Sequence, residues 1–461
     1  MLKSLISVLL CLCFTAASAE VHEYTLKNGL KLLVKEDHRA PVVVSQVWYK
    51  VGSSYEHNGV TGISHVLEHM MFQGTPKHPD GEFSRIVSEN GGDENAFTSS
   101  DYTTYFQTLE KSRLPISFEL EADRMRNLTL SKEEFKKEME VIKEERRWRT
   151  EDDPQSMTYE VAMATAFQTS PYRNPTVGWM ADLDSMTIDK VKKWYRQWYA
   201  PNNATVVVAG DVEPDAVFAL AKKYFGSLKP EQIEPPLDRP EVPQQGIKRV
   251  TVKRPAEVPY LMMIYKTPGL KDALKQDSIE DWEPYALEVL SGILSGGGSA
   301  RFSSNLIRGQ EIAASVDSGY RMTSRLEGLF VISGTPSNGN SVDELEKAVR
   351  AEIGSLQKDL VSDEELDRVK AQVVSSDVYE RDSVFYQAMN LGTLESVGIP
   401  WTLVDEYVGH IETVTPEQIR TVAKKYFIDD VLTVADLDPL PVDKARRRGP
   451  PPGGPHNDVA R

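Results

Sequence analysis

Apolar and polar positions along this chain follow two periods, one typical of strands and one typical of helices. Residues 31–35 and 42–49 alternate between apolar and polar side chains or run apolar, as the strands of a sheet do. Residues 135–148 are instead rich in helix-forming side chains. The pattern predicts an α+β protein.

Two distant segments resemble each other and indicate a duplicated plan. Residues 186–199 and 414–427 match at an offset of 228 positions, and in both a threonine opens the expected helix and an aromatic pair closes it. A β-branched run follows each segment, at residues 204–209 and 431–435. The repeat predicts two homologous halves of similar size, each an α/β sandwich.

The stretch between the halves carries repeated prolines and acidic residues without apolar periodicity, which is typical of a stiff, extended linker. The expected division is residues 20–229 for the first domain, 230–248 for the linker and 249–441 for the second domain. Residues 442–461 are rich in proline and glycine and are expected to be a disordered tail.

The first nineteen residues have the features of a cleaved Sec-type signal peptide. A basic start at Lys3 precedes a short apolar run, and residues 17–19 read Ala-Ser-Ala, a typical cleavage site. Both cysteines of the chain, Cys11 and Cys13, lie within this segment. No later stretch approaches the roughly 20 apolar residues of a transmembrane helix. We therefore expect a periplasmic protein without a transmembrane segment.

The charge of the chain excludes one class of partner. Asp and Glu number 69 against 53 Lys and Arg, which gives a formal net charge of −16, and no basic stripe precedes the tail. This balance argues against nucleic acid as a partner. It favours cationic peptides as substrates, although a solvated acidic surface explains the same charge.

The strongest chemical signal is the H-x-x-E-H pattern formed by His65, Glu68 and His69. On a helix, residues four apart share a face, so both imidazoles can bind one ion. A catalytic zinc ion has three protein ligands and a water, and a carboxylate beside that water can take its proton. Glu68 is the candidate base. The alternative is two surface histidines with Glu68 as a capping or salt-bridging group.

The third ligand is indicated by a resemblance. The H-x-x-E-H pattern is the signature of inverzincins, and residues 141–145, Val-Ile-Lys-Glu-Glu, resemble the V-I-x-x-E segment of the M16 family of metallopeptidases. This resemblance implies Zn²⁺ bound by His65, His69 and Glu145, which lies 76 positions beyond His69. It also implies a supporting catalytic acid at Glu138. Glu144 competes with Glu145 for the ligand position.

A third segment also resembles that family. Residues 89–106 are similar to its G-G-x-x-N-A-x-T block, which implies an edge strand beside the zinc site. An edge strand offers backbone groups to a peptide, so Asn95 and Ala96 are candidate substrate-binding residues. A Gly-Gly turn followed by an ordinary strand explains the same residues equally well.

The second half departs from the family at one position. Residues 306–315 resemble a block in which an arginine and a tyrosine seven positions later hold substrate and the developing oxyanion. Arg308 matches the arginine, but the tyrosine position is Ser315. Either a related subunit supplies the pair, or Arg308 or Tyr320 suffices within a homodimer. A surface arginine is the alternative for Arg308.

The resemblance implies a clam shell of two halves around a substrate chamber, and a zinc-dependent endopeptidase that hydrolyses peptides or unfolded segments in the periplasm. The expected assembly is a homodimer, or a heterodimer with a related M16 subunit. The alternative is a non-catalytic or weakly active peptide-binding subunit that needs a partner with the Arg/Tyr pair. A zinc-dependent hydrolase with a non-peptide substrate is a third possibility.

Overall fold

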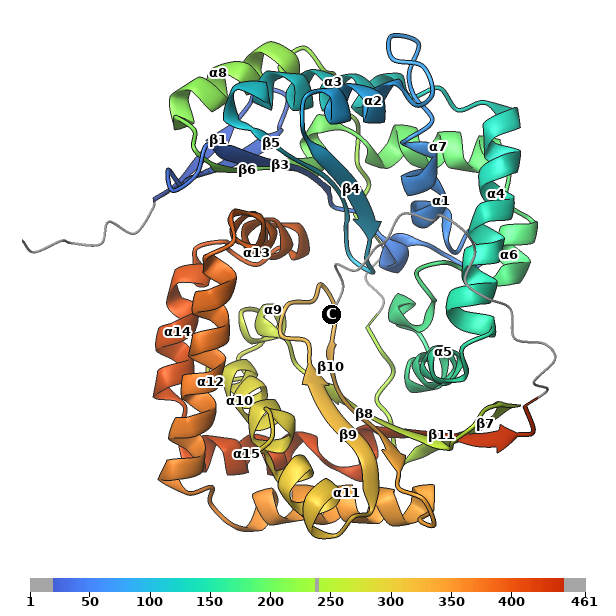
Figure 1. Ribbon diagram of the computed structural model, residues 1–461, viewed down its shortest axis with the longest axis vertical. Helices are drawn as coiled ribbons and strands as arrows, with labels where there is room; N and C mark the ends of the chain where they lie inside the picture. Colours follow the sequence, from blue (N-terminus) through green and yellow to red (C-terminus); the bar gives the residue numbers. More distant parts are fainter. Residues whose placement is uncertain (1–19, 237–239, 443–461) are drawn as a thin grey trace, which may run out of the picture.

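A computed structural model describes residues 20–236 and 240–442 as two open sheets, each covered by helices (Figure 1). The predicted signal peptide lies outside the described residues, and so does the predicted tail from residue 443 onward. The chain has the expected mixed α/β fold in two halves.

The first sheet has six strands in the order β1-β2-β6-β3-β5-β4. The expected strands at residues 31–35 and 42–49 are present as β2 and β3. Neighbours are antiparallel except for the parallel pair β2–β6. The strands are β1 Val21–Thr25, β2 Lys31–Glu36, β3 Val42–Tyr49, β4 Asp93–Thr98, β5 Thr103–Glu110 and β6 Ala204–Gly210.

The second sheet has five strands in the order β7-β11-β8-β10-β9, with one parallel pair, β7–β11. Apart from β1, its order and directions match those of the first sheet strand for strand. The duplication expected from the repeat is therefore present in the topology. The strands are β7 Lys248–Pro255, β8 Tyr260–Thr267, β9 Ala313–Tyr320, β10 Gly328–Pro336 and β11 Leu432–Leu440.

The repeated helices that suggested the duplication are α7 and α15. Thr187 caps α7 by accepting a hydrogen bond from the Lys190 N–H, and Thr415 caps α15 in the same way. The helices of the first half are α1 Ile63–Met70, α2 Glu82–Glu89, α3 Leu114–Asn127, α4 Lys132–Arg146, α5 Pro154–Ala166, α6 Met180–Asp184, α7 Ile188–Trp198 and α8 Pro214–Tyr224.

The second half has the helices α9 Leu270–Ala273, α10 Glu283–Ser295, α11 Val342–Lys358, α12 Asp363–Arg381, α13 Val384–Val397, α14 Leu403–Thr413 and α15 Pro416–Tyr426. By order along the chain, α10 takes the place of α1 and α12 takes the place of α4.

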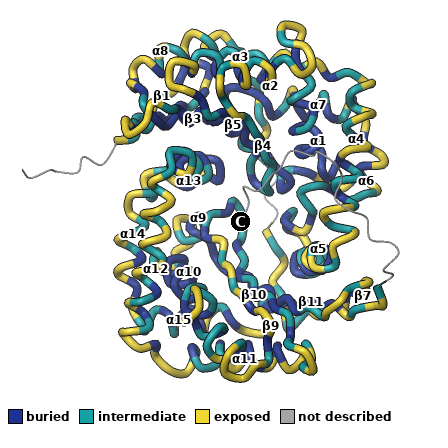
Figure 2. Tube along the Cα trace, viewed as in Figure 1, coloured by how far each residue is buried: buried dark blue, intermediate teal, exposed yellow. Residues whose placement is uncertain are grey.

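One helix of each half packs on the sheet of the other half. Leu32 and Val34 point into the core of the first half, whereas Leu33, between them, packs in a separate cluster with Ala388 and Leu391 of α13. In the same way, α5 covers the outer face of the second sheet, where Ala162 and Ala166 meet Met262 and Ile264. Strand alternation gives each sheet two apolar faces, and helices from both halves bury them (Figure 2).

The segment between α8 and β7 has no helix or strand among its described residues, as expected for a linker, but it is anchored. The Glu241 carboxylate accepts hydrogen bonds from the backbone N–H groups of Gln168, Thr169 and Ser170 and contacts Lys266 Nζ at 3.2 Å. Glu241 thus ties the segment to residues of both halves. The domain limits and the chamber between the halves stay predictions.

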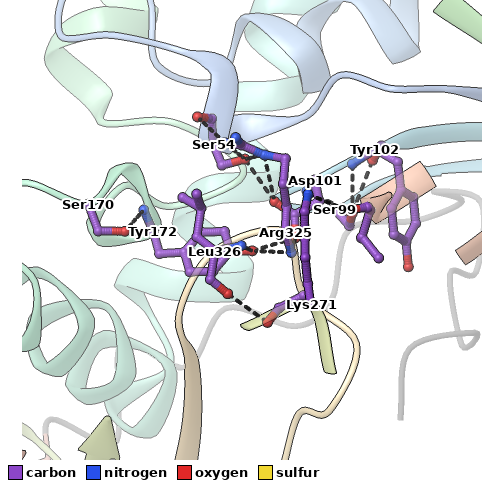
Figure 3. A network of polar contacts seen from close by, with 11 residues as sticks. Ser54, Ser99, Asp101, Tyr102, Ser170, Tyr172, Lys271, Arg325 and Leu326 are labelled. Carbon is purple, nitrogen blue, oxygen red and sulfur yellow. Dashed lines mark hydrogen bonds and ion pairs between the residues drawn. The ribbon is translucent and has the colours of Figure 1, made fainter. Parts of the chain in front are cut away.

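A buried polar network joins the two halves close to α1 (Figure 3). Arg325, in the loop between β9 and β10, donates from Nη2 to the Ser54 carbonyl at 3.0 Å, and its guanidinium lies 4.3 Å from the Tyr55 ring centre. Its backbone N–H donates to Asp101 at 3.0 Å, and Asp101 also accepts from the Tyr172 hydroxyl. Each partner is buried or nearly so, so the contact restrains how the halves meet.

We expect Gly392→Ala to destabilise the docking of α13 on the first sheet. An added Cβ would lie 2.1 Å from Trp48 Cε2, so the indole has to move. Overpacking of this kind costs about 1 to 3 kcal/mol, measurable by urea unfolding. Gly409→Ala in α14 is the matched control, because its Cβ meets no atom within 4 Å, and it should stabilise by about 0.5 to 1 kcal/mol. Equal stability of the two variants would contradict this packing.

We expect Arg325→Met to lower the unfolding temperature and to increase the radius of gyration in small-angle scattering, because it removes the guanidinium between the halves. Asp382→Asn is the control. Asp382 also bridges the halves, through Arg39 at 3.1 Å, but its side chain is 71% exposed, and exposed pairs contribute about 0 to 1 kcal/mol. An Arg325 variant no different from the Asp382 variant would show that the network does not restrain the halves.

Candidate metal centre

A tight turn and a buried acid fix the start of α1, the helix that carries the histidines. Gly62 caps the helix with a φ of 84°, and a Cβ at this residue would lie 2.4 Å from the Val177 carbonyl. The Glu56 carboxylate accepts hydrogen bonds from the N–H groups of Gly62 at 2.7 Å and Ser64 at 2.8 Å. Burial raises the pKa of Glu56 to about 8 although these bonds oppose the rise. These contacts hold the start of the helix at Gly62.

The structure brings His65, His69 and Glu145 together at the contact of α1 with α4. Glu145 Oε2 lies 3.6 Å from His65 Nε2 and 3.3 Å from His69 Nε2, and the three ligand atoms lie within 4.8 Å of one another. The neighbouring candidate, Glu144, is not part of this group and accepts a hydrogen bond from Arg147 instead. The geometry thus selects Glu145.

The donor set fits a zinc ion. Two imidazole nitrogens and one carboxylate are ligands of catalytic zinc sites, with bonds of about 2.0 to 2.2 Å. Donors on a tetrahedral ion with such bonds lie about 3.3 to 3.6 Å apart, close to the 3.3 and 3.6 Å measured between the imidazoles and Glu145. His65 Nδ1 is buried and has no hydrogen-bond partner among the described residues.

The electrostatics favour a positive charge between these side chains. Burial lowers the pKa of His69, but the carboxylates of Glu138 and Glu145 outweigh it and raise the value to about 10. For Glu145, burial is outweighed by the histidines, and the pKa falls to about 2. Burial and the neighbouring His69 lower the pKa of His65 to about 4. The carboxylates around His69 therefore favour a positive charge at this group.

Two further side chains hold the ligands in place. Glu138 accepts from His69 Nδ1 at 3.0 Å and from Gln73 Nε2 at 3.1 Å. A carboxylate on the second ring nitrogen fixes the orientation and tautomer of a metal-binding histidine. Arg149, in a π-helical turn after α4, contacts Glu145 Oε1 at 2.9 Å. This contact leaves Glu145 Oε2 directed at the histidines.

Glu68 lies beside the group and is held from the edge strand. Its Oε2 accepts a hydrogen bond of 2.6 Å from the Thr98 hydroxyl at the end of β4. The side chain is buried, and burial raises the pKa of Glu68. A carboxylate with a raised pKa is a stronger base, as proton transfer near neutral pH requires.

Strand β4, which carries the candidate substrate-binding residues, is at the edge of its sheet, and β5 is its one partner among the described strands. Ala96 points into the core and is 2% exposed, so a peptide can reach only its backbone. The Ala96 N–H donates to the Asn95 side chain at 2.8 Å. An added strand would meet Asn95 and the open edge beside Glu68.

The structure does not bring Arg308 into this arrangement. Arg308 is in the turn η6, Phe302–Gly309, where its Nη2 donates to the Gly298 carbonyl and the Ser304 hydroxyl. The turn η6 precedes the start of β9, whereas the loop that contacts the first half follows the other end of β9. The eight residues of β9 span roughly 25 Å, so this strand separates Arg308 from that loop. Ser315 is near the start of β9, and Tyr320 donates to the Pro268 carbonyl at 2.5 Å.

Sequence reasoning missed four residues of the site. Thr98 is the last residue of the N-A-x-T block, and Arg149 is one helical turn after Glu145, so both left a local signal. Glu56 and Gln73 left no such signal. Their roles depend on where the loop before α1 and the residues after α1 lie in space.

Two family models match the chain. The model described as "Insulinase (Peptidase family M16)" matches residues 31–178, which include every residue of the metal centre described above. The model described as "Peptidase M16 inactive domain" matches residues 185–373.

Relatives and solved structures agree with these matches. The zinc protease PqqE of Helicobacter pylori is 35% identical over 350 residues, which make up 75% of this chain and 77% of that protein. The crystal structure of a protease from Helicobacter pylori superposes with a TM-score of 0.85 at 31% identity and covers 91% of this chain and 100% of its own. The first half of the periplasmic protease PqqL from Escherichia coli shares the fold, with a TM-score of 0.75 at 19% identity over 90% of this chain and 91% of its own.

We expect Glu138→Gln to weaken zinc binding by about 10-fold to 100-fold, because it removes the anion that orients His69. Competition with a chelator of known affinity measures the change. Glu140→Gln is the control on the same helix, since its side chain is 71% exposed and its nearest cation, Lys143, is 3.9 Å away. Equal zinc affinity of the two variants would show that Glu138 does not position the ligand.

Proposed function

Because the chain belongs to the M16 family of zinc proteases, we propose that it is a zinc-dependent endopeptidase of peptides or unfolded protein segments. The observation that carries this proposal is the convergence of His65, His69 and Glu145 with Glu68 beside them. The cofactor is Zn²⁺, and these three residues are the proposed ligands.

Each side chain has one role in the proposed reaction. Zinc, when bound, supplies a Lewis acid that polarises the scissile carbonyl and acidifies a water. Glu68 takes the proton from the attacking water and later gives it to the leaving amine. The Thr98 hydroxyl holds one Glu68 oxygen, so the carboxylate keeps its orientation through both transfers. Glu138 keeps His69 in the tautomer that leaves Nε2 for the ion.

The peptide is proposed to lie along β4 as an added strand. This edge offers backbone donors and acceptors, and it ends at Thr98, which contacts Glu68. Recognition through the backbone requires an extended segment, so folded proteins are poor substrates. Asn95 is the side chain placed to contact the peptide.

We propose that the protein works in the periplasm. The expected signal peptide supports export, and the periplasmic protease PqqL from Escherichia coli has the same fold. Among the described helices, none has the length and apolar character to cross a bilayer.

A second candidate function is a weakly active subunit that needs a related M16 chain. Ser315 in the tyrosine position favours it, because loss of one oxyanion donor costs about 100-fold to 1000-fold in turnover. The assembly would then be a heterodimer rather than a homodimer. Hydrolysis by the purified chain alone supports the first candidate, and hydrolysis only after mixing with the related chain supports the second.

We expect Glu68→Gln to reduce hydrolysis of an unstructured peptide by about 100-fold to 10,000-fold while the zinc content stays the same, because the base is lost and the ligands remain. Metal analysis and cleavage followed by mass spectrometry measure both. Glu145→Gln should lose zinc and activity together, and Glu144→Gln should keep both. Unchanged hydrolysis by Glu68→Gln would overturn the mechanism.

A further inference from the structure

A cavity of about 790 Å³ lies in the second half, away from the metal centre. Its walls come from α10, α12, α13, α14 and the loop between β9 and β10, which lie side by side in Figure 1. None of its lining residues belongs to the metal centre.

The cavity occupies the place that corresponds to the metal centre in the other half. Helices α4 and α12 start alike. Ser131 and Ser362 are their N-caps, and glutamates occupy the second and third positions after each cap. Counted from the caps, Glu138 corresponds to Val369 and Glu145 corresponds to Ser376, which both line the cavity.

Helix α10 completes the correspondence with α1. Tyr285 and Glu288 of α10 keep the spacing of His65 and Glu68, and both line the cavity. The duplication has therefore kept a pocket and one acid, while the metal-binding side chains have become aromatic, apolar or small.

Negative charge predominates in the lining. It contains three carboxylates, those of Glu288, Asp377 and Glu380, and one cation, the exposed Arg321. Asp377 pairs with Arg381 at 2.7 Å. For Glu288 and Glu380, the described residues provide no hydrogen bond or ion pair to the side chain. Burial and the nearby Glu380 raise the pKa of Glu288 to about 7, as expected for a largely enclosed carboxyl group without a cationic partner.

The rest of the lining suits an aliphatic chain that ends in a cation. Aromatic rings bind ammonium and guanidinium groups on their faces, and apolar walls accept the methylenes of lysine or arginine. The cavity has both kinds of wall: its partly exposed rings are Tyr320 and Tyr407, and its partly exposed apolar side chains are Val373, Leu403 and Val404.

The cavity also lies near the proposed path of the peptide. Tyr102, in the turn after β4, packs against the core of the second half and against the cluster between the first sheet and α13, and it hydrogen-bonds Thr393 of α13. Thr393 lines the cavity. One turn of chain therefore connects the edge strand beside Glu68 with the cavity wall.

We propose that this cavity binds a lysine or arginine side chain of the peptide at a distance from the scissile bond, with Glu288 as the counter-ion. The inference rests on the proposed function for its substrate class, and it gives the second half a role in substrate selection.

A binding experiment without hydrolysis tests this. The probe is a fluorescein-labelled, extended peptide with one lysine, compared with the same peptide carrying norleucine, by fluorescence anisotropy on the zinc-loaded full chain with Glu68→Gln. The lysine peptide is expected to bind at least about 10-fold more tightly, and Glu288→Gln should remove this difference without weakening the norleucine peptide.

Two further variants keep the test decisive. Ser376→Lys places a lysine at an exposed position of the lining and should also abolish the preference, even if Glu288→Gln fails to fold. Asp367→Asn, exposed on the same helix and outside the cavity, should leave it intact. Equal binding of the two peptides, or a preference that survives both cavity variants, overturns the proposal.

The outcome is separable from that of the proposed function. If Glu68→Gln left hydrolysis unchanged but the lysine preference depended on Glu288, the mechanism would fail and the cavity would stand. If hydrolysis depended on Glu68 and the lysine preference was absent, the mechanism would stand and the cavity proposal would fail.

Discussion

The packing of α4 against α1 is the contact on which the metal centre depends. The two histidines are fixed relative to each other by helical spacing alone, but the third ligand comes from a helix 76 positions further along the chain. The burial of Met139 and Ile142 of α4 in the core of the first half sets the height at which Glu145 meets the imidazoles. A shift of α4 by one residue would turn Glu145 about 100° away from them.

The two halves share a topology and differ in what their equivalent helices carry. In the first half, α1 and α4 present histidines and acids, whereas α10 and α12 present one acid, aromatic rings and apolar side chains. The exchange of α5 and α13 between the sheets and the buried contacts of Arg325 join the halves into one unit. Chemistry in one half and side-chain recognition in the other is a division of roles that this geometry permits.

Local patterns predicted much of the fold and most of the candidate site. The strands at residues 31–35 and 42–49, the two threonine caps and the duplication into two halves were all accessible, because alternation, capping and the repeat can be recognised in the sequence. His65, Glu68 and His69 followed from helical spacing. The choice of Glu145 over Glu144 required the resemblance to a family, since both lie on one charged helix.

The patterns in the sequence could not predict contacts between segments that are far apart along the chain. No local pattern indicates that α13 covers the first sheet, because the apolar face it buries belongs to β2, β3 and β6, which are distant in the sequence. The same applies to Glu56, whose role as a cap depends on a turn at Gly62. Arg308 was placed by analogy with a block whose tyrosine is absent, and its hydrogen bonds stay within its own segment.

The most direct test of the account is anomalous diffraction at the zinc edge from crystals of the purified protein. The account predicts a single strong peak bonded to Nε2 of His65, Nε2 of His69 and the Glu145 carboxylate, at about 2.0 to 2.2 Å. A peak elsewhere, or zinc bound without Glu145, would contradict it.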